Sequence, residues 1–153
     1  MVEIKQIIVK IKTGDISGIK IIGTDDDLRD IYKSGIDNAL ITVGSMRDNT
    51  KRYELFKMVK KFGFIFPIII SQEAIIDESI KIGEGTIIMP GSIINIDSSI
   101  GKNCIINTGS IIEHDCKIGN IKPIFLTILN SSYLFVLSLM VPTVISASCM
   151  PLL

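Results

Sequence analysis

The segment from Ile70 to Gly119 reads ISQEAIIDESIKIGEGTIIMPGSIINIDSSIGKNCIINTGSIIEHDCKIG, and an isoleucine recurs in it at every sixth position without a gap. These isoleucines are Ile70, Ile76, Ile82, Ile88, Ile94, Ile100, Ile106, Ile112 and Ile118. Within the quoted segment, the residue four places after each of these isoleucines is small, with Ile80 as the exception. The small residues are Ala74, Thr86, Ser92, Ser98, Cys104, Ser110 and Cys116. An Ile-Gly pair also returns every eighteen residues, so three six-residue units make one larger repeat.

A period of six inside a period of eighteen fits neither an α-helix nor a flat sheet. It fits a prism in which each coil has three short faces. On each face one aliphatic side chain points inward, and a small residue lies where the chain turns to the next face. Stacked coils would pair about 4.8 Å apart, so that isoleucine lies on isoleucine along each edge. A sandwich of isoleucine-rich strands would not keep one register over nine repeats. We therefore predict a parallel β-helix over residues 69–120.

Residues 1–68 alternate strand and helix signals. The predicted strands are Ile16–Gly23, Asn38–Val43 and the extended run Phe64–Ile70. Thr24, followed by three aspartates, is typical of a helix start. A second, amphipathic helix should begin after Asp48 or Asn49. The near-continuous apolar run of residues 38–43 indicates a buried parallel strand, and the whole segment predicts half of a doubly wound α/β layout.

Residues 121–153 form a hydrophobic tail without the repeat, in which Lys122 is the only charged residue. The run Ile124–Val141 has nearly the length of a membrane span. Polar residues at Asn130–Ser132 interrupt its middle, and no basic cluster follows it, so a membrane role is disfavoured. A shifted reading frame near Asn120, a membrane anchor and a genuine cap of the last coil all remain open.

The charge balance narrows the function classes. The chain has 16 basic and 16 acidic residues, which gives no field to attract nucleic acid or an anionic membrane surface. Its three cysteines have no CxxC spacing, so neither a metal site nor a disulfide framework is indicated. These thiols suit a reducing cytoplasm, and the charged N-terminus does not resemble a signal peptide.

The single histidine, His114, lies between Glu113 and Asp115. The neighbouring Ile112 and Cys116 occupy inward slots of the repeat, so His114 should project from a corner or outer face. A neighbouring carboxylate stabilises the imidazolium, which suits a general base. A surface histidine that merely flanks two carboxylates is the alternative, and the pattern does not decide which carboxylate reaches the ring.

Two stretches of the repeat, IGEGTIIMPGSIIN and IGKNCIINTGSIIEHDC, resemble the bacterial family of sialic acid O-acetyltransferases and UDP-amino-sugar N-acetyltransferases. The upstream stretch IIGTDDDLRDIYKSGIDNALITVG is similar to the N-terminal sugar-binding domain of that family. The resemblance runs from about Ile16 to Asn120. Its most specific part is INTG followed by EHDC, and it leans towards the sialic acid branch.

The resemblance implies a partial Rossmann-like domain joined to a left-handed β-helix, a homotrimer with active sites between neighbouring β-helices, and acetyl-CoA as donor. It gives the role of catalytic base to His114, with Asp115 raising its basicity. Glu113 and Asn107 match positions that shape the acceptor site. Gly44 matches a glycine that contacts the sugar, and no metal is implied.

The expected activity is transfer of an acetyl group from acetyl-CoA to a hydroxyl of sialic acid, with His114 taking the hydroxyl proton. Ser110 and Cys116 occupy inward slots, so we expect them to be structural rather than nucleophilic. Acetylation of a UDP-amino-sugar is the alternative, as is a non-catalytic fragment of such an enzyme.

Three departures from the family support the fragment interpretation. Met1–Asp15 carries no glycine-rich loop, and Ser71-Gln72 stands where the family tends to have His-Pro. The family also continues past EHDC with further coils that supply a second histidine and groups for acetyl-CoA. The chain is therefore similar to such an enzyme shortened at both ends.

Overall fold

A computed structural model describes residues 7–8, 14–16, 18–43, 48–124 and 128–129. The chain divides into two compact units. Residues up to 39 together with 57–65 form the first unit, and residues 40–56 together with those from 66 onward form the second. Each unit is described by itself.

The first unit contains a small mixed sheet. Its strands are β1 (Ile7–Ile8), β2 (Asp15–Ile16) and β3 (Ile19–Gly23), in the order β1-β3-β2. β1 runs parallel to β3, whereas β2 pairs with β3 antiparallel. The strand predicted over Ile16–Gly23 is therefore confirmed over Ile19–Gly23 only, and Ile16 belongs to a separate strand. Gly18, at φ 80°, lies in a turn that separates the two strands. The backbone amide of Gly18 donates to the Asp15 carboxylate.

The first helical segment begins as the sequence predicts. The backbone N–H of Thr24 and its hydroxyl both donate to the Asp27 carboxylate, at 2.8 and 3.0 Å. A 3₁₀ turn, η1 (Asp25–Asp27), leads into α1 (Leu28–Lys33), and Gly35 follows with φ 96°. Leu28 and Ile31 are buried on one face of α1.

The predicted buried strand over Asn38–Val43 does not form. Asn38 makes one parallel bridge with Ile65, and residues 39–43 belong to no strand. The carbonyls of Ile41 and Val43 instead accept hydrogen bonds from the guanidinium of Arg52, at 2.5 and 3.0 Å. A side chain thus takes the acceptors that a neighbouring strand would use. The described residues contain only part of an α/β layout, and the Rossmann-like domain is not confirmed.

Arg52 lies on the helix α2 (Thr50–Lys61), which starts where predicted, with the Thr50 amide bonded to Asp48 at 2.8 Å. Its side chain is only 1% exposed, and it also donates to the carbonyl of Asn103 at 3.2 Å. Burial lowers the pKa of Arg52 to about 10, so the side chain is still a cation at neutral pH. Amphipathic periodicity places Arg52 on the same helical face as Val59, seven residues later, but a basic side chain there is expected to be exposed, so its burial was not predicted.

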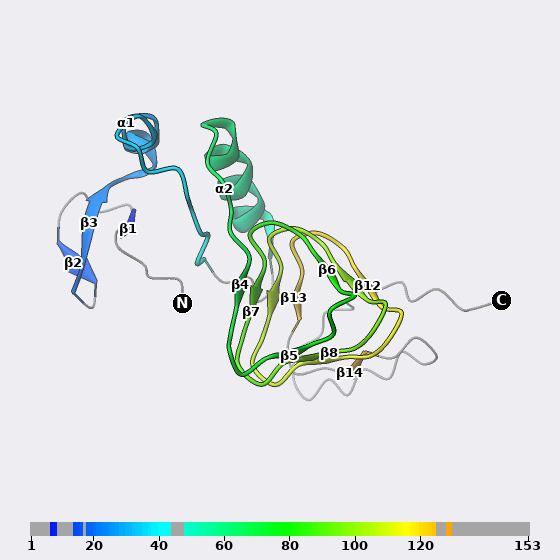
Figure 1. Ribbon diagram of the computed structural model, residues 1–153. Coiled ribbons are helices and arrows are strands. Elements are labelled where there is room, and N and C mark those ends of the chain that lie inside the picture. The colour runs from blue at the N-terminus through cyan, green and yellow to red at the C-terminus, as the bar shows by residue number, and fades with distance from the viewer. Residues whose placement is uncertain (1–6, 9–13, 17, 44–47, 125–127, 130–153) are drawn as a thin grey trace. The chain divides into compact units, whose positions relative to one another are not determined.

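The second unit is a parallel β-helix of two-residue strands (Figure 1). The strands are β4 (Ile69–Ile70), β5 (Ile75–Ile76), β6 (Lys81–Ile82), β7 (Ile87–Ile88), β8 (Ile93–Ile94), β9 (Ser99–Ile100), β10 (Ile105–Ile106), β11 (Ile111–Ile112), β12 (Lys117–Ile118), β13 (Pro123–Ile124) and β14 (Ile128–Leu129). They form three sheets, ordered β13-β10-β7-β4, β14-β11-β8-β5 and β12-β9-β6. The predicted three-sided prism is confirmed, while its left-handedness stays a prediction.

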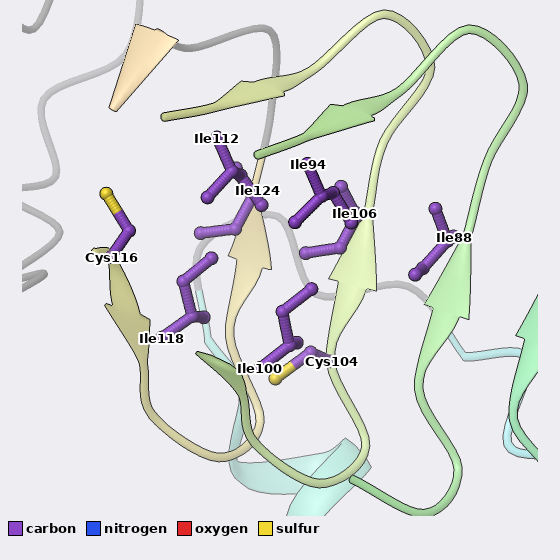
Figure 2. Packing of buried hydrophobic residues seen from close by; sticks show 9 residues of the cluster. All are labelled: Ile88, Ile94, Ile100, Cys104, Ile106, Ile112, Cys116, Ile118 and Ile124. Carbon is purple, nitrogen blue, oxygen red and sulfur yellow. The ribbon is translucent and has the colours of Figure 1, made fainter. Parts of the chain in front are cut away.

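The core is the stack of repeated isoleucines, and Figure 2 shows them converging on the axis of the prism. The hexad isoleucines from Ile88 to Ile118 are at most 5% exposed. Ile70 in the first coil is 48% exposed, because it lies at the open end of the stack. Pairing also continues past the predicted limit at residue 120, since Ile124 of β13 is 2% exposed and β14 pairs with β11.

The small residues of the repeat are buried, and the hydroxyl groups among them form hydrogen bonds with the next coil. Ser98 donates its hydroxyl to the carbonyl of Glu113 at 2.7 Å and accepts from the amide of Cys116 at 3.0 Å. Thr86 repeats this arrangement at another corner, with the carbonyl of Gly101 and the amide of Cys104. A small hydroxyl therefore satisfies two buried backbone groups where the chain turns.

The corners recur with the same period as the core. Every sixth residue from 85 onward has a positive φ. These residues are Gly85, Gly91, Asp97, Asn103, Gly109, Asp115 and Ile121. Glycine, asparagine and aspartate tolerate this left-handed conformation, whereas a β-branched residue such as Ile121 does so at a cost.

No helix in the described part of the chain is long and apolar enough to cross a membrane. The tail predicted over 121–153 falls largely on residues 125–127 and 130–153, which lie outside the described ranges. The three interpretations of that tail therefore remain predictions.

Candidate functional site

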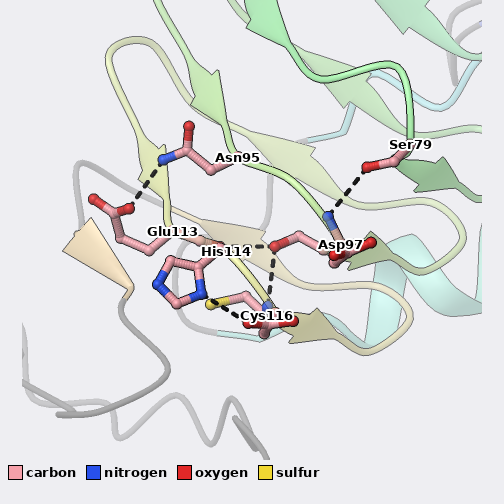
Figure 3. Close-up of polar contacts among 8 residues, drawn as sticks. Ser79, Asn95, Asp97, Glu113, His114 and Cys116 are labelled. Carbon is pink, nitrogen blue, oxygen red and sulfur yellow. Dashed lines mark hydrogen bonds and ion pairs between the residues drawn. The ribbon is translucent and has the colours of Figure 1, made fainter.

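The candidate site is the corner at residues 113–116, between β11 and β12 (Figure 3). The inward Ile112 and Cys116 are fully buried on either side of it. Their burial turns the intervening residues outward, and the His114 side chain is 50% exposed. The prediction that this histidine projects from a corner rather than into the core is confirmed.

Asp115, rather than Glu113, holds the imidazole. Its Oδ2 lies 2.7 Å from Nδ1 of His114, and its own side chain is 36% exposed. Asp115 has φ 61°, and its amide donates to the carbonyl of Ile96 in the preceding coil at 3.1 Å. The left-handed corner conformation and the contact with the preceding coil thus fix the backbone that carries the carboxylate.

This contact assigns the two ring nitrogens of His114 different roles. An ionised carboxylate can only accept a hydrogen bond, so Nδ1 carries the proton. The neutral imidazole then has its lone pair on Nε2, which has no hydrogen-bond partner among the described residues. Nε2 is therefore available to take a proton from a substrate, and Asp115 stabilises the imidazolium that results.

Glu113 is directed to a different partner. Its carboxylate accepts a hydrogen bond of 2.9 Å from the side-chain amide of Asn95, which occupies the same corner one coil earlier. The sequence analysis did not name Asn95. Its position, eighteen residues before Glu113, is the signal that could have found it.

Asn107 and Gly44 are not brought to this corner by the described structure. Asn107 lies between β10 and β11, one corner before His114, and its side-chain amide donates to the carbonyl of Ile124 at 2.9 Å. Gly44 lies outside the described residues. A role for either residue in sugar binding stays a prediction.

The hydroxyl and thiol groups near the site are structural, as predicted. Ser110 is fully buried and donates to the carbonyl of Ile124, and the Cys116 side chain is fully buried as well. Burial also raises the pKa of the Cys104 thiol, which disfavours the nucleophilic thiolate. Across the described ranges, no group of three or more histidine, cysteine or acidic side chains could hold a metal ion.

Comparison with known proteins gave matches among solved structures only. No protein-family model and no curated protein matches the chain. PerB from Caulobacter crescentus, solved with CoA and GDP-perosamine, is 32% identical with a TM-score of 0.66, over 71% of this chain and 51% of that chain. A variant of GDP-perosamine N-acetyltransferase from the same organism, with alanine in place of one histidine, is 33% identical over 70% of this chain and 50% of that chain, with a TM-score of 0.65.

The acetyltransferase domain of PglB from Neisseria gonorrhoeae, solved with acetyl-CoA, is 25% identical with a TM-score of 0.65, over 73% of this chain and 53% of that domain. The chain thus spans about half the length of the solved proteins it matches. These neighbours are acetyltransferases, solved with CoA or acetyl-CoA bound.

Proposed function

We propose that the chain is an acetyltransferase that moves an acetyl group from acetyl-CoA to the amino group of a nucleotide-linked amino sugar. The observation that carries the proposal is the 2.7 Å contact between Nδ1 of His114 and Asp115, which leaves Nε2 open at an exposed corner. The likeness to a protein solved with CoA and GDP-perosamine supports the substrate class. It favours the amino-sugar alternative over a hydroxyl of sialic acid.

The geometry suggests a direct transfer without an acyl-enzyme. The sugar amine attacks the thioester carbonyl, and a bond forms between nitrogen and carbon. Nε2 of His114 takes the proton that the nitrogen then carries, while Asp115 stabilises the imidazolium. The carbon–sulfur bond breaks, and the imidazolium returns the proton to the departing CoA thiolate. Ser110 and Cys116 are buried, which supports a route without a protein nucleophile.

We also propose that the chain acts as a homotrimer in the cytoplasm. Outward positions on two of the three sheets are isoleucines, apart from Pro123 on β13, and Ile75 on β5 is 66% exposed. The third sheet presents Lys81 and Lys117. Isoleucine faces favour contact with other copies, and light scattering of the purified protein measures the assembly.

The test is an acetylation assay on a panel of acceptors. The purified chain is incubated with acetyl-CoA and with UDP- and GDP-linked amino sugars, free sialic acid or nucleotide-activated sialic acid, and the sugars are analysed by mass spectrometry. We expect acetylation of an amino sugar at nitrogen. Acetylation confined to a hydroxyl of sialic acid would place the protein in the O-acetylating branch, and no product with any acceptor would refute the proposal.

Substitution of the base links the activity to this corner. His114→Ala should reduce turnover by ~10²–10⁴-fold, as is typical for loss of a general base. Gln72→Ala, which alters an exposed residue of the first coil, is the matched control and should retain activity. An alanine variant of His114 with unchanged turnover would remove this residue from the mechanism.

A further inference from the structure

The residue that occupies the position of His114 one coil earlier is an isoleucine. Ile96 and His114 are eighteen residues apart and follow the paired strands β8 and β11. Two hydrogen bonds hold these corners in register, from Asn95 to Glu113 and from the Asp115 amide to the carbonyl of Ile96. Ile96 is therefore adjacent to the histidine along the edge of the prism.

Ile96 differs from the other outward residues of this edge. Its side chain is 52% exposed and lies outside the hydrophobic core. The remaining outward positions on the three coils carry polar or charged residues: Asp77, Glu78, Ser79, Asn95, Asp97, Glu113, His114 and Asp115. A single exposed isoleucine is ordinary on a protein surface. Here it is the one aliphatic side chain on a polar edge, beside the residue with an open Nε2.

We propose that Ile96 is a specificity-determining residue that contacts an apolar group of the substrate beside the reacting atoms. This inference rests on the proposed acetyl transfer at His114. The chemistry recognised is a methyl group or an aliphatic C–H surface, which either the sugar ring or the acyl arm of the donor can supply. Contact with such a group covers the exposed isoleucine and excludes water next to the base.

Ile96→Thr tests the contact because threonine keeps the branch at Cβ and replaces apolar surface with a hydroxyl. We expect kcat/KM to fall on the order of tenfold, the size typical of a lost aliphatic contact in a binding site. If the loss in kcat/KM differs between sugars with and without a methyl group, the contact is with the acceptor. If the loss in kcat/KM differs between acetyl-CoA and propionyl-CoA, the contact is with the donor. Ile65→Thr, at an isoleucine of the first unit that is 55% exposed, is the control and should keep the wild-type value.

A binding measurement separates this inference from the proposed function. In protein with labelled isoleucine methyl groups, the Ile96 signal is identified by its absence in Ile96→Val, and it should shift on titration with a nucleotide-linked amino sugar or with CoA. No shift with either ligand overturns the inference, even in an active enzyme. A shift without any acetyl transfer supports the contact and refutes the proposed activity. Unchanged kcat/KM for every substrate pair in Ile96→Thr also overturns the inference.

Discussion

Gly101 lies at a corner where consecutive coils approach so closely that no side chain fits. A Cβ atom built on Gly101 would lie 2.6 Å from Oδ1 of Asn120 and 2.7 Å from the backbone carbon of Gly119. Ordinary contacts between such atoms are about 3.5–4.0 Å. Gly101→Ala must therefore move the two coils apart locally by nearly an ångström. Gly119 offers a matched control, because no described atom lies within 4 Å of its hypothetical Cβ.

The size of the effect follows from the contacts that such a shift would break. The amide of Gly101 donates to the carbonyl of Ile118, and the amide of Lys102 donates to Asn120, both at 2.8 Å. Lengthening both beyond hydrogen-bonding range costs about 1 kcal/mol each. Overpacking destabilises the folded state by about 1–3 kcal/mol more. The alanine also reduces the entropy of the unfolded chain, which offsets roughly 0.4–1 kcal/mol of this loss. We expect a net loss of about 2–4 kcal/mol in the free energy of unfolding.

Urea and thermal unfolding, followed by circular dichroism, measure this loss. For a chain of this size, about 3 kcal/mol corresponds to a fall in Tm on the order of 10 °C. Gly119→Ala should stay within about 0.5 kcal/mol of the parent. Equal stability of the two variants would show that the coils do not approach as closely at Gly101 as the structure indicates.

Three further substitutions test the other features of the β-helix unit. Asp115→Asn should lower turnover in the acetylation assay, by less than the ~10²–10⁴-fold expected for loss of the base, while Asp97→Asn at the same corner of the preceding coil should not change it. Ile121→Asn should raise the free energy of unfolding by about 1 kcal/mol in urea, because φ 57° is strained for a β-branched residue; a loss of stability would contradict this. Arg52→Met should lower the free energy of unfolding by about 2–4 kcal/mol, because three backbone carbonyls lose a charged hydrogen-bond donor. Lys51→Met, its exposed neighbour on α2, should be nearly neutral in the same measurement, and equal effects would contradict a special role for the arginine.

The β-helix was predictable because its rule is local and repeated. On each face of a coil one isoleucine points inward and a small residue lies at the turn. A shift of the register by one residue would therefore expose all of the inward isoleucines. The same periodicity predicted that His114 projects outward, since Ile112 and Cys116 occupy the buried slots. The burial of Ser98, with its two hydrogen bonds, followed from the same rule.

The segment before the β-helix was less predictable because its contacts are not periodic. An apolar run such as Asn38–Val43 resembles a buried strand, yet Arg52 takes two of its carbonyls. The spacing of α2 places that arginine on the same face as Val59, but basic residues are mostly exposed in proteins, so its burial was not predicted. The choice of Asp115 over Glu113 as partner of His114 was also undecided, because it depends on Asn95 in the preceding coil.

The geometry of the repeat explains why the acidic partner of the histidine is the residue after it. Every sixth residue must adopt a positive φ, and aspartate is among the residues that tolerate it. Asp97 meets the same backbone requirement one coil earlier without a histidine beside it. Aspartate at this corner is therefore no sign of chemistry by itself, and the chemical information lies in the residue before it. That position changes from Ile96 to His114 between two coils whose following residues, Asp97 and Asp115, both have a positive φ. We infer that the fold favours residues that tolerate a positive φ at this corner, aspartate among them, and that function acts on the variable position beside it.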